Sequence, residues 1–186
     1  MYKKIMIIAM LALNTANVLA QEAKKDTKVP ETKMEAFASK TGTITKFTDQ
    51  NLANLKTAYE VTEARIRKIN SGMNTSYFFQ IIKTGKYSNP TASIEYSDLI
   101  EVIKALKTLM PEVDKDILNK PDYLENKFVT VDGFQIGYYV SKEKATWYMK
   151  LEKYGTENTV FINDVTTIDS IFNEAKTKIE EQKSIK

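Results

Sequence analysis

Carboxylates are the side chains with which this chain could do acid–base chemistry. Hydrolysis of a glycosidic bond, for example, needs two acids roughly 5–9.5 Å apart, one to give a proton and one to attack or to activate water. No spacing in the sequence singles out such a pair, so a carboxylate-dependent hydrolase stays an alternative interpretation. The available acids are Glu60, Glu63, Glu95, Asp98, Asp132 and Glu152.

Histidine and cysteine are both absent from the 186 residues. A Ser-His-Asp triad, a thiol nucleophile, haem attachment and an ordinary zinc site are therefore excluded. The six glycines are scattered and form no phosphate-binding loop. Together these absences argue against an enzyme, and we expect no cofactor and no metal site.

Two consecutive hairpins are predicted in the C-terminal half of the chain. Asp132-Gly133, between the apolar runs Phe128–Val131 and Phe134–Val140, is a strong two-residue hairpin signal. The loop Ser141–Lys144 then leads into a further strand at Ala145–Leu151. Neighbouring strands are thus expected to be antiparallel.

Strand alternation assigns the side chains of the second hairpin to two faces. If residues 141–144 close the hairpin, Val140 lies opposite Ala145, Tyr138 opposite Trp147 and Gly137 opposite Tyr148. One face is then apolar and is expected to form the core; it carries Phe134, Ile136, Tyr138, Val140, Trp147, Met149 and Leu151.

The opposite face is half polar and is the candidate ligand-binding surface. Two tyrosines bracket Gly137 on it, and tyrosine rings suit stacking on a sugar or contact with an extended peptide. A structural explanation is the alternative, because an aromatic ring often covers a strand glycine and tyrosines are common on exposed sheet faces. The candidate binding residues are Tyr139, Tyr148, Gln135, Thr146 and Lys150.

Two amphipathic helices share one spacing. Residues 98–110 carry apolar residues at helical intervals, with Asp98 as the expected cap and Pro111 as the expected end; the apolar set is Leu99, Val102, Ile103, Leu106 and Met110. The same intervals recur 69 residues later, with Thr166 or Thr167 as the cap, at Ile168, Ile171, Phe172, Ala175 and Ile179.

The 69-residue offset also relates aromatic residues upstream, since Phe78-Phe79 corresponds to Trp147-Tyr148 and Tyr59 to Phe128. We therefore predict an α+β fold with antiparallel sheets packed by helices and a tandem duplication of a strand-meander-plus-helix unit. A bend or bulge is expected at Glu63-Ala64, where strand alternation slips. Residues 48–56 fit either a short helix or a loop. The expected boundaries are a first repeat at 41–110, a linker at 111–122 and a second repeat at 123–183.

The N-terminus has the three parts of a cleavable signal peptide. Lys3 and Lys4 precede an apolar run from Ile5 to Leu13, and small residues end the segment at Ala20. The run is too short to span a bilayer, which takes about 20 residues. Residues 1–20 are therefore predicted to be removed, leaving a flexible polar spacer at 21–40 in which order begins near Met34–Phe37.

Charge and location narrow the possible partners. The chain has 27 basic and 24 acidic residues, and removal of 1–20 takes two lysines and no acid, leaving 25 against 24. Such a balanced chain is not expected to bind nucleic acid, and the mature chain is expected to have no transmembrane segment. No cysteine stands near the cleavage point, so a periplasmic or secreted protein without a lipid anchor is predicted.

The function that these patterns favour is a non-catalytic exported binding or interaction module, with a glycan or a peptide as its partner. The alternatives are the carboxylate-dependent hydrolase and a structural envelope protein. Two converging carboxylates in a pocket would favour the hydrolase, whereas a face of exposed aromatic rings would favour the binding module.

Overall fold

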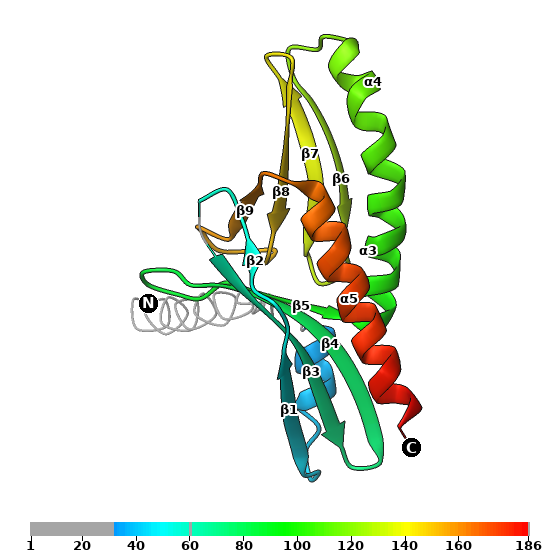
Figure 1. Cartoon of the computed structure of the whole chain (residues 1–186). Helices are drawn as coiled ribbons and strands as arrows, with labels where there is room; N and C mark the ends of the chain where they lie inside the picture. Colours follow the sequence, from blue (N-terminus) through cyan, green and yellow to red (C-terminus); the bar gives the residue numbers. More distant parts are fainter. Residues whose placement is uncertain (1–31, 60, 186) are drawn as a thin grey trace, which may run out of the picture. The chain divides into compact units, whose positions relative to one another are not determined.

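The structure of the chain, a computed structural model, describes residues 32–59 and 61–185. These residues form two antiparallel sheets packed by helices, so the predicted α+β class is confirmed (Figure 1). The predicted signal peptide at 1–20 and most of the predicted spacer lie outside the described residues.

Sheet 1 contains five strands and sheet 2 contains four. In sheet 1 the order is β1-β3-β4-β5, with β2 paired to β3; the strands are β1 (Thr45–Asn51), β2 (Leu55–Lys56), β3 (Val61–Ser71), β4 (Asn74–Lys83) and β5 (Thr91–Glu95). In sheet 2 the order follows the chain, with β6 (Leu124–Val129), β7 (Gln135–Ser141), β8 (Lys144–Lys150) and β9 (Thr159–Ile162). The segment 48–56, for which a short helix or a loop was expected, is mostly strand, so neither alternative was correct.

Both long helices form where apolar spacing predicted them. They are α3 (Tyr96–Leu109) and α5 (Val165–Ser184), and the predicted apolar residues are buried in both, except Met110, which lies just beyond α3 and is half-buried. The caps differ from the prediction. Glu95 caps α3 by accepting a hydrogen bond from the Ser97 N–H, and Asp164 caps α5 by accepting from the Thr166 N–H at 2.9 Å.

Pro111 does not end the helical path. It lies in the first turn of a 3₁₀ helix, η1 (Met110–Glu112), which leads directly into α4 (Val113–Leu118). Proline is tolerated there because the first residues of a helix need no N–H donor. Helical turns therefore occupy much of the segment 111–122 that was predicted as a linker.

One apolar core joins the two sheets to α3 and α5. Phe172 of α5 contacts Phe79 of β4 at a ring-centroid distance of 5.1 Å and Phe134 of the β6–β7 turn at 6.1 Å. All seven side chains assigned to the core face of the second hairpin are buried. The predicted faces of β7 and β8 are therefore correct.

The turn between β6 and β7 is longer than the two residues predicted. The Thr130 N–H donates to the Phe134 carbonyl at 2.9 Å, and the Gly133 N–H donates to the Thr130 carbonyl at 3.0 Å. Gly133 has a φ of +90°, a conformation that glycine adopts without strain. Asp132-Gly133 thus marks the turn correctly, although the strands separate at Val129 and Gln135.

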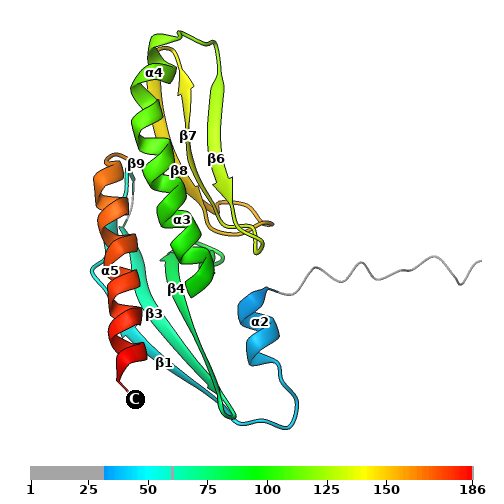
Figure 2. The same ribbon diagram turned by 90° about the vertical axis from the view of Figure 1, so that its right-hand side faces the viewer.

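Sheet 1 is covered on both faces. The helix α2 (Lys33–Ala38) occupies the end of the predicted spacer and lies on the face of sheet 1 opposite α5 (Figure 2). Ile69 and Phe78 are fully buried on the α2 side, whereas Ile66 and Phe79 are buried on the α5 side.

The helices on both faces of sheet 1 explain why the apolar residues of β3 do not alternate regularly in the sequence. The β3–β4 ladder runs without interruption from Thr62↔Lys83 to Ser71↔Asn74, so the bulge expected at Glu63-Ala64 was wrong. Apolar residues change from one face of β3 to the other because each face is buried by a different helix.

The two sheets share the pattern of antiparallel strands followed by a long helix. A 69-residue offset aligns the buried residues of α3 with those of α5, but it pairs Phe78, on the α2 side of sheet 1, with Trp147, on the core side of sheet 2. The tight turns Gly72-Met73 and Lys142-Glu143 are 70 residues apart instead. The tandem duplication stays a prediction.

Candidate functional site

The candidate site is the face of sheet 2 opposite α3, here called the outer face. Helices α3 and α4 lie along the other face of the sheet in Figures 1 and 2. The predicted register is confirmed, with Val140↔Ala145, Tyr138↔Trp147 and Gly137↔Tyr148 paired. All five predicted binding residues therefore share the outer face: Gln135, Tyr139, Thr146, Tyr148 and Lys150.

Tyr148 forms the floor of this face. Its side chain is 7% exposed, and its hydroxyl donates a hydrogen bond to Glu125 Oε1 at 2.6 Å. Because Tyr148 is on β8 and Glu125 is on β6, the ring must cross β7, and it does so at Gly137, its pairing partner. The ring thus covers the strand glycine, as the structural alternative proposed.

Gly137 is required by the approach of β6. A Cβ at this position would overlap the carbonyl oxygen of Asn126 and lie 2.7 Å from the Cα of Lys127. The glycine therefore keeps the strands close and leaves room for the Tyr148 ring.

The contact between Tyr148 and Glu125 changes the titration of both groups. The hydrogen bond from Tyr148, followed by the contact with Lys127 at 3.2 Å, lowers the pKa of the Glu125 carboxyl. Burial, followed by the hydrogen bond to Glu125, raises the pKa of the Tyr148 hydroxyl. At neutral pH a protonated phenol therefore donates to an ionised carboxylate.

Tyr139 lies in a more open part of the outer face. It is half-buried, pairs across the strands with Thr146, and stacks on Tyr123 with the centroids 6.1 Å apart and the rings 23° from parallel. On the other side of Thr146, the ring of Phe161 on β9 meets the exposed ring of Tyr59 edge-on at 6.2 Å.

A hollow of about 280 Å³ opens between these rings. This volume lies just below the range of about 300–1,000 Å³ that holds a drug-sized ligand, so it suits one ring with its substituents. Aromatic, hydroxyl, amide and ammonium groups surround it. Its lining residues are Ala58, Tyr59, Tyr139, Lys144, Ala145, Thr146, Phe161, Ile162 and Asn163.

The predicted residues divide into three groups along the sheet. Tyr139 and Thr146 line the hollow, and Tyr148 lies beneath the face. Gln135 and Lys150 are paired at the opposite end of the β7–β8 ladder and do not line the hollow.

Sequence reasoning missed several residues of the hollow. Phe161 had a usable signal, because alternation along β9 places it on the face opposite Val160 and Ile162. Tyr59 had none, because it reaches Phe161 only through the fold, where the Ala58 N–H donates to the Phe161 carbonyl at 2.9 Å.

Several of the predicted carboxylates have structural partners. Lys33 Nζ lies 2.6 Å from Asp98 Oδ1, and the Lys33 N–H donates to the carboxylate of Asp132 at 3.1 Å. Burial raises the pKa of the Asp132 carboxyl, although the hydrogen bond from Lys33 opposes that change. Glu152 accepts from the Thr91 N–H at 2.8 Å. These acids therefore anchor α2 and β5.

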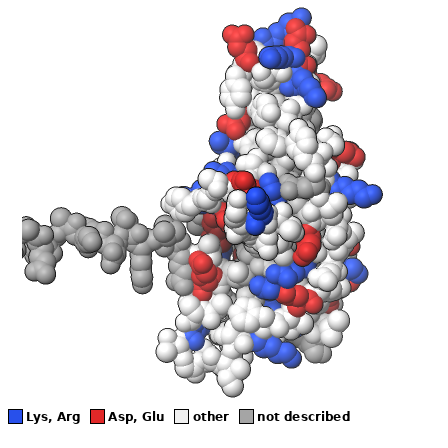
Figure 3. Space-filling model, turned by 90° about the vertical axis from the view of Figure 1, so that its left-hand side faces the viewer, with Lys and Arg blue, Asp and Glu red and all other residues white. Residues whose placement is uncertain are grey.

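The outer face carries scattered charge, since strand register places Glu125, Lys127, Lys144 and Lys150 on it. Figure 3, which looks at the side away from α3, shows charged side chains at the tip and among uncharged atoms below it. Among residues 32–59 and 61–185, no group of three or more acidic side chains is placed to hold a metal ion.

No helix of the described residues is both long and apolar enough to cross a membrane. No protein-family model, curated protein or solved structure matched the chain. The class of protein is therefore defined by its α+β fold and by the aromatic hollow of sheet 2.

Proposed function

We propose that the chain is an exported, non-catalytic binding protein that takes a glycan against the outer face of sheet 2. The observation that carries the proposal is the hollow between Tyr139, Phe161 and Tyr59, which combines ring surfaces with the polar groups of Thr146 and Asn163. Polar atoms supply more of the exposed lining than apolar atoms do, which suits a ligand with many hydroxyl groups.

The geometry favours a glycan over an extended peptide. Peptides that bind sheets gain affinity by pairing with a free strand edge. Beside the hollow, β9 pairs with β8 on one side, and on the other its Phe161 carbonyl already accepts from the Ala58 N–H. One main-chain acceptor of this edge is thus occupied at the hollow, and the face of rings beside it offers a surface on which a sugar ring can stack.

Binding is tested with the mature chain and a panel of oligosaccharides, first by thermal unfolding and then by calorimetry. A ligand at a hundredfold excess over its Kd raises the free energy of unfolding by about 2.7 kcal/mol. We expect the double variant Tyr139→Ala, Phe161→Ala to lose binding, whereas Tyr87→Ala keeps it, because Tyr87 is an exposed tyrosine on the loop between β4 and β5.

A glycan that binds the double variant as tightly as the unchanged protein would contradict the proposed site. Turnover of a bound oligosaccharide, followed by chromatography of the products, would contradict the non-catalytic part of the proposal. The export part is tested separately by N-terminal sequencing of the mature protein, which we expect to begin near Gln21. A mature product that retains residues 1–13 would contradict export by cleavage.

A further inference from the structure

Polar side chains that make no hydrogen bond line the hollow, and Gln135 and Lys150 at the other end of the same face are also unbonded within the described residues. Within the described part of the chain, the side-chain polar groups of Tyr139, Thr146 and Asn163 make no hydrogen bond. Tyr148, on the same face, is by contrast fully engaged with Glu125. Unused donors and acceptors thus converge on the hollow.

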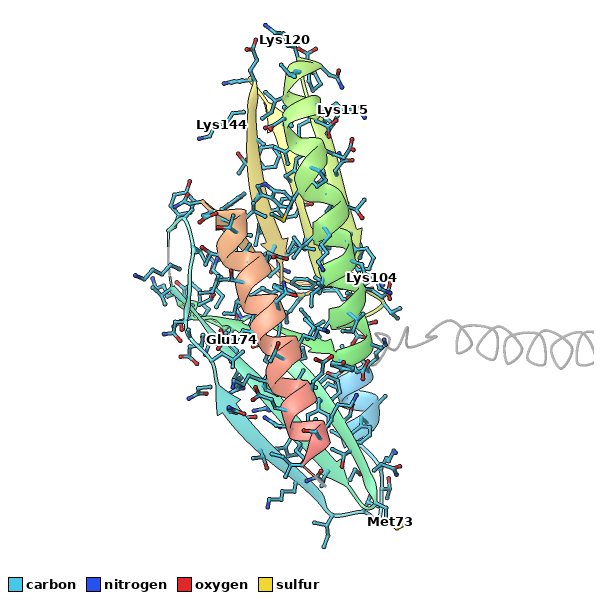
Figure 4. All side chains as sticks on the ribbon, turned by 45° about the vertical axis from the view of Figure 1, so that its right-hand side comes forward. Met73, Lys104, Lys115, Lys120, Lys144 and Glu174 are labelled. Carbon is cyan, nitrogen blue, oxygen red and sulfur yellow. The ribbon has the colours of Figure 1, made fainter. Side chains whose placement is uncertain are left out.

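The charge of the hollow comes from Lys144. Among the described residues, no other ionisable acid or base lines it besides the tyrosines. Two nearby lysines are paired, since Lys120 lies 3.3 Å from Glu143 and Lys127 lies 3.2 Å from Glu125, whereas Lys142 and Lys150 have no ion pair among the described residues. Lys144 has no carboxylate within ion-pair distance among residues 32–59 and 61–185. Figure 4 shows it at the start of β8, directed away from α3 and α5.

We propose that the hollow binds an acidic sugar whose carboxylate pairs with Lys144 while its ring lies against Tyr139 and Phe161. This inference rests on the glycan-binding function proposed above and narrows its ligand class. An ammonium group beside aromatic walls and unused hydrogen-bonding groups is complementary to a sugar that carries both hydroxyls and a negative charge.

The alternative source of a carboxylate is the C-terminus of a peptide. It is disfavoured because the Phe161 carbonyl, the edge acceptor beside the hollow, is already occupied by the Ala58 N–H, and a peptide gains its affinity from such main-chain hydrogen bonds.

The test compares sugars that differ only in the charge. Oligomers of galacturonic acid, glucuronic acid and sialic acid are titrated calorimetrically against the mature chain, each beside its methyl ester. We expect at least one acid to bind about fivefold more tightly than its ester, which is the size of one partly exposed charged contact. Lys144→Gln should remove this preference, and Tyr139→Ala should weaken the acid and the ester together.

Lys150→Gln is the matched control, because Lys150 lies on the same face at the other end of the strands. It should leave the preference for the acid unchanged. An equal loss in both lysine variants would mean general attraction by a basic face and would overturn the assignment to Lys144.

Three other outcomes are decisive. Equal affinity for acids and esters, with Tyr139→Ala still deleterious, would overturn the acidic ligand and leave the glycan-binding function standing. A failure of every acid and ester, together with failure of the neutral panel, would overturn both. A peptide whose free C-terminus displaces the sugar, while its amidated form does not, would overturn the choice of a sugar.

Discussion

The outer faces of the two sheets differ in how their side chains are satisfied. On sheet 1, the face opposite α5 lies under α2 and carries a closed polar network. Arg65 Nε donates to Gln80 Oε1 at 2.8 Å, and Gln80 Nε2 donates to Ser93 Oγ at 2.8 Å. Gln80 is 1% exposed, yet both ends of its amide are bonded.

The cover over sheet 1 is itself fixed in place. Thr32 and Glu35 form a capping box at the start of α2, and Lys33 ties the helix to Asp98 and Asp132. Short helices are marginal alone, so these contacts hold α2 against the sheet. Beneath it, Phe78 and Ile69 are fully buried.

The outer face of sheet 2 also carries aromatic rings and polar groups. Around the hollow, however, no helix covers it and no hydrogen-bond network joins its polar side chains within the described residues. Only the part beneath Tyr148 is closed, by its bond to Glu125. The comparison shows that the outer face of sheet 2 keeps partly exposed rings and unbonded polar groups around the hollow, whereas the face of sheet 1 under α2 is closed.

The largest expected effect concerns the sealed face. Phe78→Ala should lower the free energy of unfolding by about 3–5 kcal/mol, because a fully buried ring is removed from between α2 and sheet 1. Urea unfolding followed by circular dichroism measures it. A loss below about 1 kcal/mol would mean that α2 does not seal this face, and the contrast between the sheets would disappear.

The sequence predicted the faces of the strands in sheet 2, but it did not predict them in sheet 1. In sheet 2 a single buried face gives strict alternation, so the faces and register of β7 and β8 followed from the pattern alone. In sheet 1 both faces are covered, which scrambles the alternation of β3. The strand β1 escaped detection because every residue after Thr45 in it is exposed, so it has no apolar period.

Only part of the candidate site could be predicted from the sequence, because the rest depends on contacts between residues that are distant in the chain. Tyr139 and Thr146 follow from one hairpin, but the hollow also needs Tyr59, which comes 80 residues before Tyr139 in the chain. The burial of Tyr148 depends on Glu125, two strands away. Strand alternation predicts which face of the sheet a side chain occupies. It does not predict which side chains from other strands or loops contact it there.

The second prediction concerns Gly137, the glycine that Tyr148 covers on the outer face of sheet 2. Gly137→Ala should cost about 1–3 kcal/mol, because the added Cβ overlaps backbone atoms of β6 rather than a movable side chain. Thermal and urea unfolding measure the loss. The control is Thr146→Ala on the adjacent strand, which should lower the free energy of unfolding less. Gly42→Ala would be a poor control, because Gly42 has a φ of +77° and alanine would be strained there. Equal costs would show that β6 can yield.

The third prediction concerns the hydrogen bond between Tyr148 and Glu125. Tyr148→Phe keeps the ring over Gly137 and should lower the free energy of unfolding by about 1–2 kcal/mol at pH 7, the lower range for a bond to a charged group that also contacts Lys127.

The pH dependence of that difference has a defined sign. The lowered pKa of Glu125 means that its stabilisation is lost as the pH falls below the usual carboxyl range. The raised pKa of Tyr148 means that its stabilisation is complete below the ordinary tyrosine pKa of about 10 and is lost as the pH rises through the higher folded value. The variant and the unchanged protein should therefore converge at acidic and strongly alkaline pH. Tyr138, whose pKa burial raises to about 12, titrates in both proteins and cancels in the comparison. A difference that does not vary with pH would contradict the bond.

The smallest expected effect on stability belongs to Tyr139, which the proposed function places at the binding site. Tyr139 is half-buried and stacks on the exposed Tyr123, and its hydroxyl has no hydrogen-bond partner in the described chain. Tyr139→Ala should therefore cost no more than about 1 kcal/mol, since substitutions at partly exposed positions without buried bonds change stability little. Urea unfolding of Tyr139→Ala and Phe78→Ala compares the loss in free energy of unfolding at the two faces. A ring kept for packing would give comparable losses for both variants, and the outer face of sheet 2 would then be a structural surface. A ring available to a ligand gives a small loss of stability in Tyr139→Ala together with loss of binding, and that combination separates the hollow from the sealed face of sheet 1.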